Sequence, residues 1–494
     1  MKKLENLEVS NSFAKLGADF LQEKLPEPVP SPYLIDSNPA AIKLIGLDIA
    51  EVKKNEFLEY FSGNRLLPNS RPLAMAYSGH QFGSYNPRLG DGRGLLLGEV
   101  KDQYNNTLDI HLKGCGPTRF SRGFDGRATL RASIREYLGG EAVHGLGIPT
   151  TRSLAVIGTG ELVHRETPEP GAILVRLSDS HIRFGSFQLL HFTKKSNKVT
   201  ELLNYIIKRH YPTIQNESDK VQLLLRHVVK RTAKLIALWQ ANGFIHGVMN
   251  TDNMTITGTT FDYGPFGFMD RFNPNFTPNH SDPNGRYTYG KQPEIGYWNL
   301  SKFGETLGHL VDSQLIAEEL ANYQKIYNDD YRALMGKKLG LDIHDAEFKE
   351  LVNNLFQLLY TSQVDCCLFF RHLSKLPNNF PETFRKNFKD PQTLDSWISM
   401  YIRLIEREDP DLNVRKEKMD MINPKFILRN YLLKNATDKA MKEADFSEVE
   451  RLRILLEDPY SDRPELFTQY GINPEHYSAE TPASSIEMQL SCSA

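Results

Sequence analysis

The sequence predicts an α+β chain in which a small β-rich lobe precedes a larger helical lobe. Residues from about 71 to 178 are rich in strand patterns: 95–100 is a short apolar run, and apolar and polar residues alternate at 108–112, which is typical of a half-buried strand. Beyond residue 181 apolar residues recur every three or four positions, most clearly at 221–239, which is typical of a helix packed on a core. This order indicates a bilobal fold that clamps a nucleotide between its lobes.

Four segments are expected along the chain. Residues 1–70 form an N-terminal extension with an amphipathic segment at 13–25, a Pro-rich linker and short helices. Residues 71–178 form the β-rich lobe and 179–436 form the helical lobe. Residues 437–494 form a C-terminal segment, whose polar tail from Asp438 onward is expected to be loosely held.

Individual elements follow from local patterns. In the β-rich lobe we expect strands at 95–100, 108–112 and 173–177, and one helix where Leu130, Ile134 and Leu138 recur every four residues. In the helical lobe the helix at 221–239 should stop near Gly243. Further helices are expected at 300–312, 347–373 and 391–407.

Composition argues against several classes of protein. The 494 residues suffice for two or three packed units, and 59 Lys plus Arg balance 61 Asp plus Glu. A net charge near zero gives no general attraction to nucleic acid or to an anionic membrane. The four cysteines form no CxxC pair, which argues against a structural zinc site and a disulfide framework. No apolar stretch approaches 18 residues, so we expect a cytoplasmic protein without membrane or nucleic-acid partners.

A glycine-rich turn, Gly90-Asp91-Gly92-Arg93-Gly94, comes just before the strand at 95–100. Glycines let backbone N–H groups approach phosphate oxygens, and Arg93 adds positive charge, so Gly90, Gly92 and Arg93 are candidate nucleotide contacts. The spacing does not match a Walker P-loop. Glycine-rich hairpin turns are also common for structural reasons, so the motif alone is weak.

Lys113 ends the next expected strand, and Glu136 lies on the helix that follows. A kinase-type small lobe uses a lysine at this place to hold nucleotide phosphates and a helix glutamate to orient it. Taken singly, the two residues would be a surface ion pair, which contributes little. Their position after a glycine-rich hairpin favours a functional pair.

The most specific motif lies directly after the long amphipathic helix. It reads HGVMNTDN at 246–253 and FDYG at 261–264. Protein kinases carry HRDxxxxN and DFG in these places, so Asn253 and Asp262 are expected to bind a divalent metal beside phosphates. Oxygen ligands of this kind suit Mg²⁺.

One position departs from that pattern, because Val248 stands where kinases carry the catalytic Asp and cannot accept a proton. Asp252 is the nearest carboxylate available as general base. The chain therefore either binds nucleotide without catalysis or orients ATP differently and uses Asp252. Arg176 and Arg183, near the junction of the lobes, would hold a γ-phosphate that points inward, unless they are plain surface residues. The α-phosphate would then be open to attack, and the product would carry AMP.

Three long stretches resemble the selenoprotein O family of kinase-like protein adenylyltransferases. They are YSGHQFGSYNPRLGDGRG at 77–94, residues 111–161 and residues 246–270, and the resemblance covers nearly the whole chain. It implies a protein-kinase-like fold that binds ATP in a flipped orientation and transfers AMP to Ser, Thr or Tyr hydroxyls of proteins. Protein UMP transfer, a conventional phosphotransferase and a non-catalytic nucleotide-binding pseudokinase remain as alternatives.

The resemblance also implies roles for single residues. Nucleotide contacts would come from Gly90, Gly92, Arg93, Lys113, Asp125 and Gly126. Arg176 and Arg183 would hold the inverted phosphates, and Glu136 would pair with Lys113. Asn253 and Asp262 would bind Mg²⁺, with Mn²⁺ as an open alternative. Asp252 would accept the hydroxyl proton.

The same resemblance draws attention to Cys492, which stands near the place where some members of the family carry selenocysteine. The family is linked to redox control, so redox-related proteins are expected among the substrates. Cys492 is either a reactive thiol or a solvated bystander. Cys366 and Cys367, in an apolar segment, are expected to pack in the core. The oligomeric state is not indicated.

Overall fold

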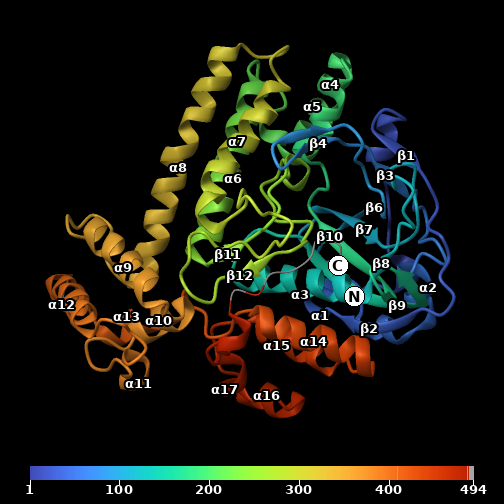
Figure 1. The fold of residues 1–494 in the computed structure, drawn as a ribbon. Helices are drawn as coiled ribbons and strands as arrows, with labels where there is room; N and C mark the ends of the chain where they lie inside the picture. Colours follow the sequence, from blue (N-terminus) through green and yellow to red (C-terminus); the bar gives the residue numbers. More distant parts are fainter. Residues whose placement is uncertain (409, 487, 489–494) are drawn as a thin grey trace.

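The computed structural model describes residues 1–408, 410–486 and 488, and it shows a sheet lobe beside a larger helical lobe, as predicted (Figure 1). The main sheet is antiparallel in every pairing, in the order β1-β3-β6-β7-β10-β9-β2, and β8 pairs with β10. Its strands are β1 (Leu21–Glu23), β2 (Tyr33–Ser37), β3 (Leu73–Met75), β6 (Gly94–Lys101), β7 (Thr107–Lys113), β8 (Ala128–Thr129), β9 (Arg152–His164) and β10 (Pro168–Ser178).

The three predicted strands are confirmed as β6, β7 and β10, and they are neighbours in the sheet. Lys113, the last residue of β7, lies opposite Gly94 of β6 and opposite Leu174 of β10. This register places the glycine-rich turn that precedes β6 beside the lysine that ends β7.

Residues 1–70 supply both edges of this sheet. β1 pairs with β3 at one edge and β2 pairs with β9 at the other, so strand pairings cross the expected boundary at residue 70. The expected amphipathic segment at 13–25 is not continuous, because Gly17 has a φ of +86° and separates a 3-10 turn at Phe13–Leu16 from β1. Two short helices follow, α1 (Pro39–Leu44) and α2 (Asn55–Phe61).

One long helix, α3 (Leu130–Gly145), interrupts the strands as predicted. Helices then dominate: α4 (Phe184–Phe192), α5 (Ser196–His210), α6 (Lys220–Ala241), α7 (Gln292–Glu305), α8 (Ser313–Leu339), α9 (Phe348–Ser362), α10 (Cys366–Leu373), α11 (Glu382–Arg385), α12 (Pro391–Glu408), α13 (Leu412–Asp420), α14 (Asn430–Glu443), α15 (Ser447–Glu457), α16 (Pro464–Tyr470) and α17 (Pro474–Ser478). The short hairpin of β4 (Gly79–Gln81) with β5 (Ser84–Asn86) borders the cleft between the lobes. The strand pair β11 (Phe244–Ile245) with β12 (Gly267–Phe268) encloses residues 246–266, several of which line the cleft.

The predicted helix at 221–239 is confirmed as α6, which buries one face in the core. The helix ends just before Gly243, and Gly243 adopts a φ of +65°. The helix expected at 300–312 lies earlier, as α7. The helix expected at 347–373 is two helices, because Gln363 adopts a φ of +55° and the Asp365 carboxylate caps a new start by accepting from Leu368 N at 2.9 Å. The sequence reading missed the 27-residue α8.

The expectation of a loose tail from Asp438 is wrong for the described part of that segment. Helix α15 packs directly against α3, and Val449, Leu452 and Leu455 on it are buried (Figure 1). A buried ion pair between Arg453 Nε and Asp36 Oδ2, at 2.8 Å, joins α15 to strand β2. The polar composition of the whole tail hid these contacts, because the apolar residues that α15 buries are concentrated in one short helix. Cys492 lies outside the described residues.

The part of the chain that the structure describes contains no helix long and apolar enough to cross a membrane.

Because α15 is docked on α3, we can predict how a substitution on α15 changes the free energy of unfolding. Leu452→Ala should lower the free energy of unfolding by about 2–5 kcal/mol, because it opens a cavity in the core shared with α3. Urea unfolding followed by circular dichroism measures this loss. Met421→Ala, at a residue that is 71% exposed, is the control and should change the value by less than about 0.5 kcal/mol. Equal stability of the two variants would contradict the docking.

Candidate active site

A cleft of about 750 Å³ lies between the two lobes. Every predicted site residue except Glu136 lines it, together with Val248. These residues are Gly90, Gly92, Arg93, Lys113, Asp125, Gly126, Arg176, Arg183, Asp252, Asn253 and Asp262. The fold thus brings together residues that are more than 170 positions apart in the sequence, although their individual roles stay predictions.

The glycine-rich turn is covered by the segment at 118–126. A Cβ atom at Gly90 would lie 2.4 Å from the Phe120 ring, and one at Gly92 would lie 2.9 Å from the Phe120 carbonyl oxygen. Gly126, with a φ of +66°, approaches the backbone of Gly116 so closely that a Cβ would lie 2.2 Å away. The glycines are therefore required by close backbone packing at the cleft, whether or not phosphate is bound.

Asp125 and Arg93 lie at the exposed rim of the cleft. Asp125 accepts hydrogen bonds from Arg165, whose Nη1 lies 2.9 Å from Oδ2 and whose Nη2 lies 3.2 Å from Oδ1. It also accepts from Arg127 N at 2.9 Å, which holds the end of the 118–126 segment in place.

Glu136 lies beneath the cleft floor and joins two cations. Its Oε2 accepts from Lys113 Nζ and its Oε1 accepts from Arg176 Nε, both at 2.5 Å, so the predicted pairing with Lys113 is present. Burial acts to raise the pKa of Glu136, but the charges of Arg176 and Lys113 outweigh it and the pKa lies below its usual value. Burial lowers the pKa of Lys113 to about 8, against the opposing effect of Glu136. Glu136 therefore stays ionised and fixes both cations.

Asp262 is clamped between two arginines. Arg176 Nη2 donates to Oδ1 at 2.7 Å and Arg183 Nη1 donates to Oδ2 at 2.8 Å. Burial acts to raise the pKa of Asp262, yet the two guanidinium groups hold it well below its usual range. Asp262 also adopts a φ of +55°, which is costly for a residue other than glycine and marks a constrained functional position.

Arg183 is almost fully buried, with 1% of its surface exposed. Its guanidinium lies between the rings of Tyr77 and Phe261, at 4.0 and 4.6 Å from their centroids. Nη1 also donates to the Asp252 carbonyl at 3.0 Å, and Nη2 lies 3.6 Å from Asp91 Oδ1. Arg183 therefore cannot be a plain surface residue, and its position is set by both lobes.

Asp252 lies in the 3-10 turn Thr251–Asn253 and lines the cleft. Its Oδ2 accepts from Gln81 Nε2 at 3.2 Å, whereas its buried Oδ1 has no hydrogen-bond partner among the described residues. Burial raises the pKa of Asp252 to about 6, although Arg183 acts in the opposite direction. A buried carboxylate with one unoccupied oxygen can accept a proton from a group in the cleft.

Asn253 and Asp262 fit a metal ion only together with other ligands. Within residues 1–408, 410–486 and 488, no three His, Cys, Asp or Glu side chains are grouped to hold a metal. Mg²⁺ beside a nucleotide usually takes one or two protein ligands and completes its shell with phosphate oxygens and water. Asn253 Nδ2 donates to the Val248 carbonyl at 2.9 Å, so its oxygen is left as the ligand atom. Each carboxylate oxygen of Asp262 retains a second lone pair, so Asn253 and Asp262 together fit such a metal site.

Several cleft residues were not predicted as site residues, among them Gln81, Phe82, Asp91 and Phe120. The available signal was that Asp91 lies inside the glycine-rich turn and that Gln81 and Phe82 lie in the stretch 77–94 that carries the family resemblance. No local pattern marked Gln81 or Phe82 individually, because they lie on a hairpin whose strands are only three residues long.

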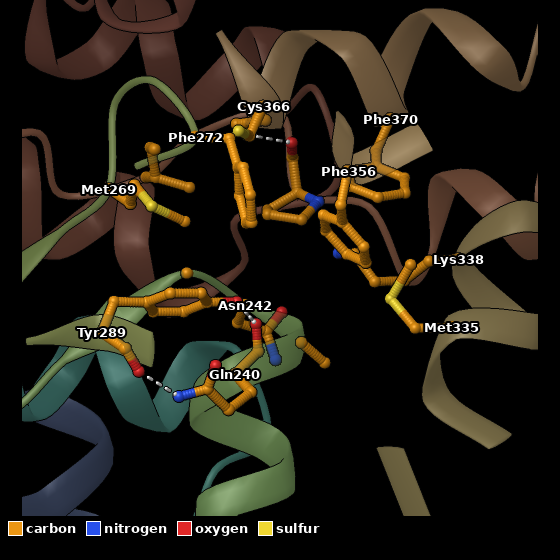
Figure 2. Close-up of a pocket in the computed structure, with 15 residues that line it drawn as sticks. Gln240, Asn242, Met269, Phe272, Tyr289, Met335, Lys338, Phe356, Cys366 and Phe370 are labelled. Atoms are coloured by element: carbon orange, nitrogen blue, oxygen red, sulfur yellow. Dashed lines mark hydrogen bonds between the residues drawn. The ribbon is translucent and has the colours of Figure 1, made fainter. Parts of the chain in front are cut away.

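A second cavity of about 50 Å³ lies in the helical lobe, and no predicted site residue borders it (Figure 2). Its lining is mostly apolar, and the buried Lys338 ammonium lies 5.0 Å from the centroid of the Phe370 ring. Cys366 and Cys367 border it and pack against apolar clusters, as predicted for core residues. Burial raises the pKa of the Cys367 thiol to about 11, so this thiol is not reactive at neutral pH.

Comparisons with known proteins agree with this geometry. A family model described as protein adenylyltransferase SelO matches residues 3–456. A protein nucleotidyltransferase YdiU of Myxococcus xanthus (strain DK1622) is 44% identical over 496 residues, and one of Pseudomonas putida (strain GB-1) is 42% identical over 494 residues. Both alignments cover the whole of each chain.

Among solved structures, ROP2 of Toxoplasma gondii, described as a virulence factor with a protein-kinase fold and no enzymatic activity, aligns with 62% of this chain and 92% of its own. The TM-score is 0.24 and the identity 12%, so this alignment carries no argument. The family match and the full-length relatives suffice by themselves: the chain belongs to the SelO family of protein adenylyltransferases.

Proposed function

We propose that this chain transfers AMP from ATP onto Ser, Thr or Tyr hydroxyls of other proteins and releases pyrophosphate. The observation that carries this proposal is the set of three buried cations, Lys113, Arg176 and Arg183, in one cleft with a valine at the kinase base position. Three buried cations suit the β- and γ-phosphates of an ATP bound with its triphosphate pointing inward. The α-phosphate then faces the acceptor.

The chemistry follows from the residues that border the cleft. The acceptor hydroxyl oxygen attacks the α-phosphorus, and the bond from that phosphorus to the oxygen bridging the α- and β-phosphates breaks. The bonding electrons leave with pyrophosphate, which Lys113, Arg176 and Arg183 stabilise as its charge grows. The hydroxyl proton passes to Asp252 Oδ1, the unoccupied oxygen.

Asn253 and Asp262 would hold a divalent cation, Mg²⁺ or Mn²⁺, which when bound supplies positive charge to the phosphates. Glu136 keeps Lys113 and Arg176 in place by bonding to both. At the rim, Gly90, Gly92, Arg93, Asp125 and Gly126 would surround the nucleotide. A cytoplasmic location and redox-related substrates are further parts of this proposal, and they rest on the sequence resemblance.

Radiolabelled ATP distinguishes this reaction from its alternatives. A protein acceptor, incubated with the chain, Mg²⁺ and labelled ATP, should retain label from the α-phosphate of ATP and not from the γ-phosphate. Label from the γ position alone would mean a conventional phosphotransferase, and label from α-labelled UTP in preference to ATP would mean UMP transfer. No label from either nucleotide, with nucleotide still bound, would mean a non-catalytic scaffold.

Asp262 provides the control for that experiment. Asp262→Ala should abolish transfer, because it removes a metal ligand and the anion that both arginines bind. Asp262→Asn keeps the size of the side chain and should also lose transfer, because the amide carries no negative charge for the metal. An unchanged circular dichroism spectrum of this variant checks that it is folded. Full transfer by Asp262→Asn would overturn the metal assignment.

If Asp252 is the base, its substitution should lower the rate of AMP transfer. Asp252→Asn should lower the rate of AMP transfer by about 10²–10⁴-fold, because an amide of the same size cannot accept the proton. ATP binding, measured by calorimetry, should persist because the three cations remain. Asp329→Asn, at an exposed surface pair, is the matched control and should transfer at the normal rate. A rate for Asp252→Asn within about threefold of the control would exclude Asp252 as the base.

A further inference from the structure

The β4–β5 hairpin crosses from the sheet lobe to the loop that carries Asp252. Three successive residues of the hairpin bond to three successive residues of that loop. The His80 N–H donates to Thr251 Oγ1 at 2.7 Å, Gln81 Nε2 to Asp252 Oδ2 at 3.2 Å, and the Phe82 N–H to Asn250 Oδ1 at 3.2 Å. The hairpin is therefore fixed against the loop that carries the proposed base.

The close approach depends on Gly79. A Cβ atom at this position would lie 2.7 Å from Asp252 Oδ1 and 3.1 Å from Thr251 Oγ1. A glycine here lets the hairpin backbone pass beside the unoccupied carboxylate oxygen without covering it with a side chain. Asp252 is thus bounded on one side by the hairpin and faces the cleft on the other.

The amide of Gln81 is oriented by a chain of hydrogen bonds. The Arg88 N–H donates to Asn86 Oδ1 at 3.0 Å, and Asn86 Nδ2 donates to Gln81 Oε1 at 3.1 Å. With its oxygen engaged in this way, Gln81 presents its NH₂ group to Asp252 Oδ2. This series of hydrogen bonds begins at the backbone N–H of Arg88, which can only donate, so the direction of every bond in the series is fixed. It keeps Oδ2 occupied and leaves Oδ1 for the acceptor.

Phe82 at the hairpin tip is explained neither by turn chemistry nor by burial. Phe82 and Gly83 have φ values of +49° and +86°, the signs of a two-residue turn that favours Asn-Gly. A phenylalanine in the left-handed region is strained, and 44% of its surface is exposed. One side of the ring packs against Tyr287 at 5.2 Å between centroids, and the ring borders the cleft. Strain in an exposed aromatic residue three positions from Gly79, which approaches the proposed base, points to function.

We propose that the tip of the β4–β5 hairpin is the acceptor side of the active site, where Phe82 contacts the acceptor polypeptide and Gln81 positions Asp252. The proposal rests on the proposed AMP transfer and names the surface that receives the protein substrate. An acceptor chain whose hydroxyl reaches Asp252 Oδ1 passes beside Phe82, because the hairpin borders the cleft there. Aromatic side chains often contribute strongly to such contacts.

Phe82→Asn tests the contact with the acceptor, because asparagine suits the turn and the fold should be retained. The probe is a mixture of unstructured synthetic peptides that each carry one Ser, Thr or Tyr. The KM for these peptides should rise about tenfold, and the KM for ATP should change by less than about twofold. Tyr104→Asn, at an exposed aromatic residue in the turn between β6 and β7, is the control and should leave both values unchanged.

Gln81→Ala tests the positioning role through a double-mutant cycle. With Asp252 present, Gln81→Ala should lower kcat by about tenfold or more and leave the KM for ATP nearly unchanged. In the Asp252→Asn background the same substitution should have almost no further effect, because Gln81 acts through that carboxylate. A merely structural role would lower kcat equally in both backgrounds.

The outcomes separate the two proposals. A wild-type chain that transfers AMP, with Phe82→Asn kinetically identical to it, would overturn the acceptor surface and leave the proposed function standing. Equal effects of Gln81→Ala in the two backgrounds would overturn the positioning role. A wild-type chain that transfers no label from α-labelled ATP would overturn the proposed function, and the acceptor surface with it.

Discussion

The carboxylate of Asp262, held by two buried arginines, is the interaction on which the rest of the site depends. Arg176 comes from the sheet and Arg183 from the start of α4, so one anion joins the sheet lobe to the helical lobe. Glu136 extends the same network to Lys113. Removing one member of such a buried set leaves an unpaired charge, at a cost of about 3–5 kcal/mol. The network therefore keeps the lobes in one arrangement around the cleft.

This network also affects how a nucleotide can bind. Arg176 and Arg183 already donate to carboxylates, so phosphate must share their remaining N–H groups or take the place of an existing bond. An arginine has five donors in a rigid fork and keeps its charge when buried, which makes sharing between carboxylate and phosphate possible. The same carboxylates hold the cations in position before the phosphates arrive, so little reorganisation accompanies binding.

In the proposed mechanism the general base is moved rather than lost. Val248 occupies the position of the kinase aspartate, and the carboxylate appears four residues later at Asp252, beside a hairpin of the other lobe. An isolated buried carboxylate would have no fixed orientation, and the amide of Gln81 supplies one. The proposed base and the proposed acceptor surface are thus parts of one structure, because the hairpin that bonds to the Asp252 carboxylate through Gln81 also carries the exposed Phe82.

The sequence by itself determined the class of fold, the strands β6, β7 and β10, the helix α6, and part of the set of residues that lines the cleft. These depend on local periodicity and on motifs such as 246–253, whose spacing is set by the backbone over a few residues. Tertiary structure alone decided that α15 docks on α3, that residues 1–70 close both edges of the sheet, and that Gln81 touches Asp252. Each of those contacts joins segments far apart in the chain, and their energy comes from burial and complementary charge that no local pattern records.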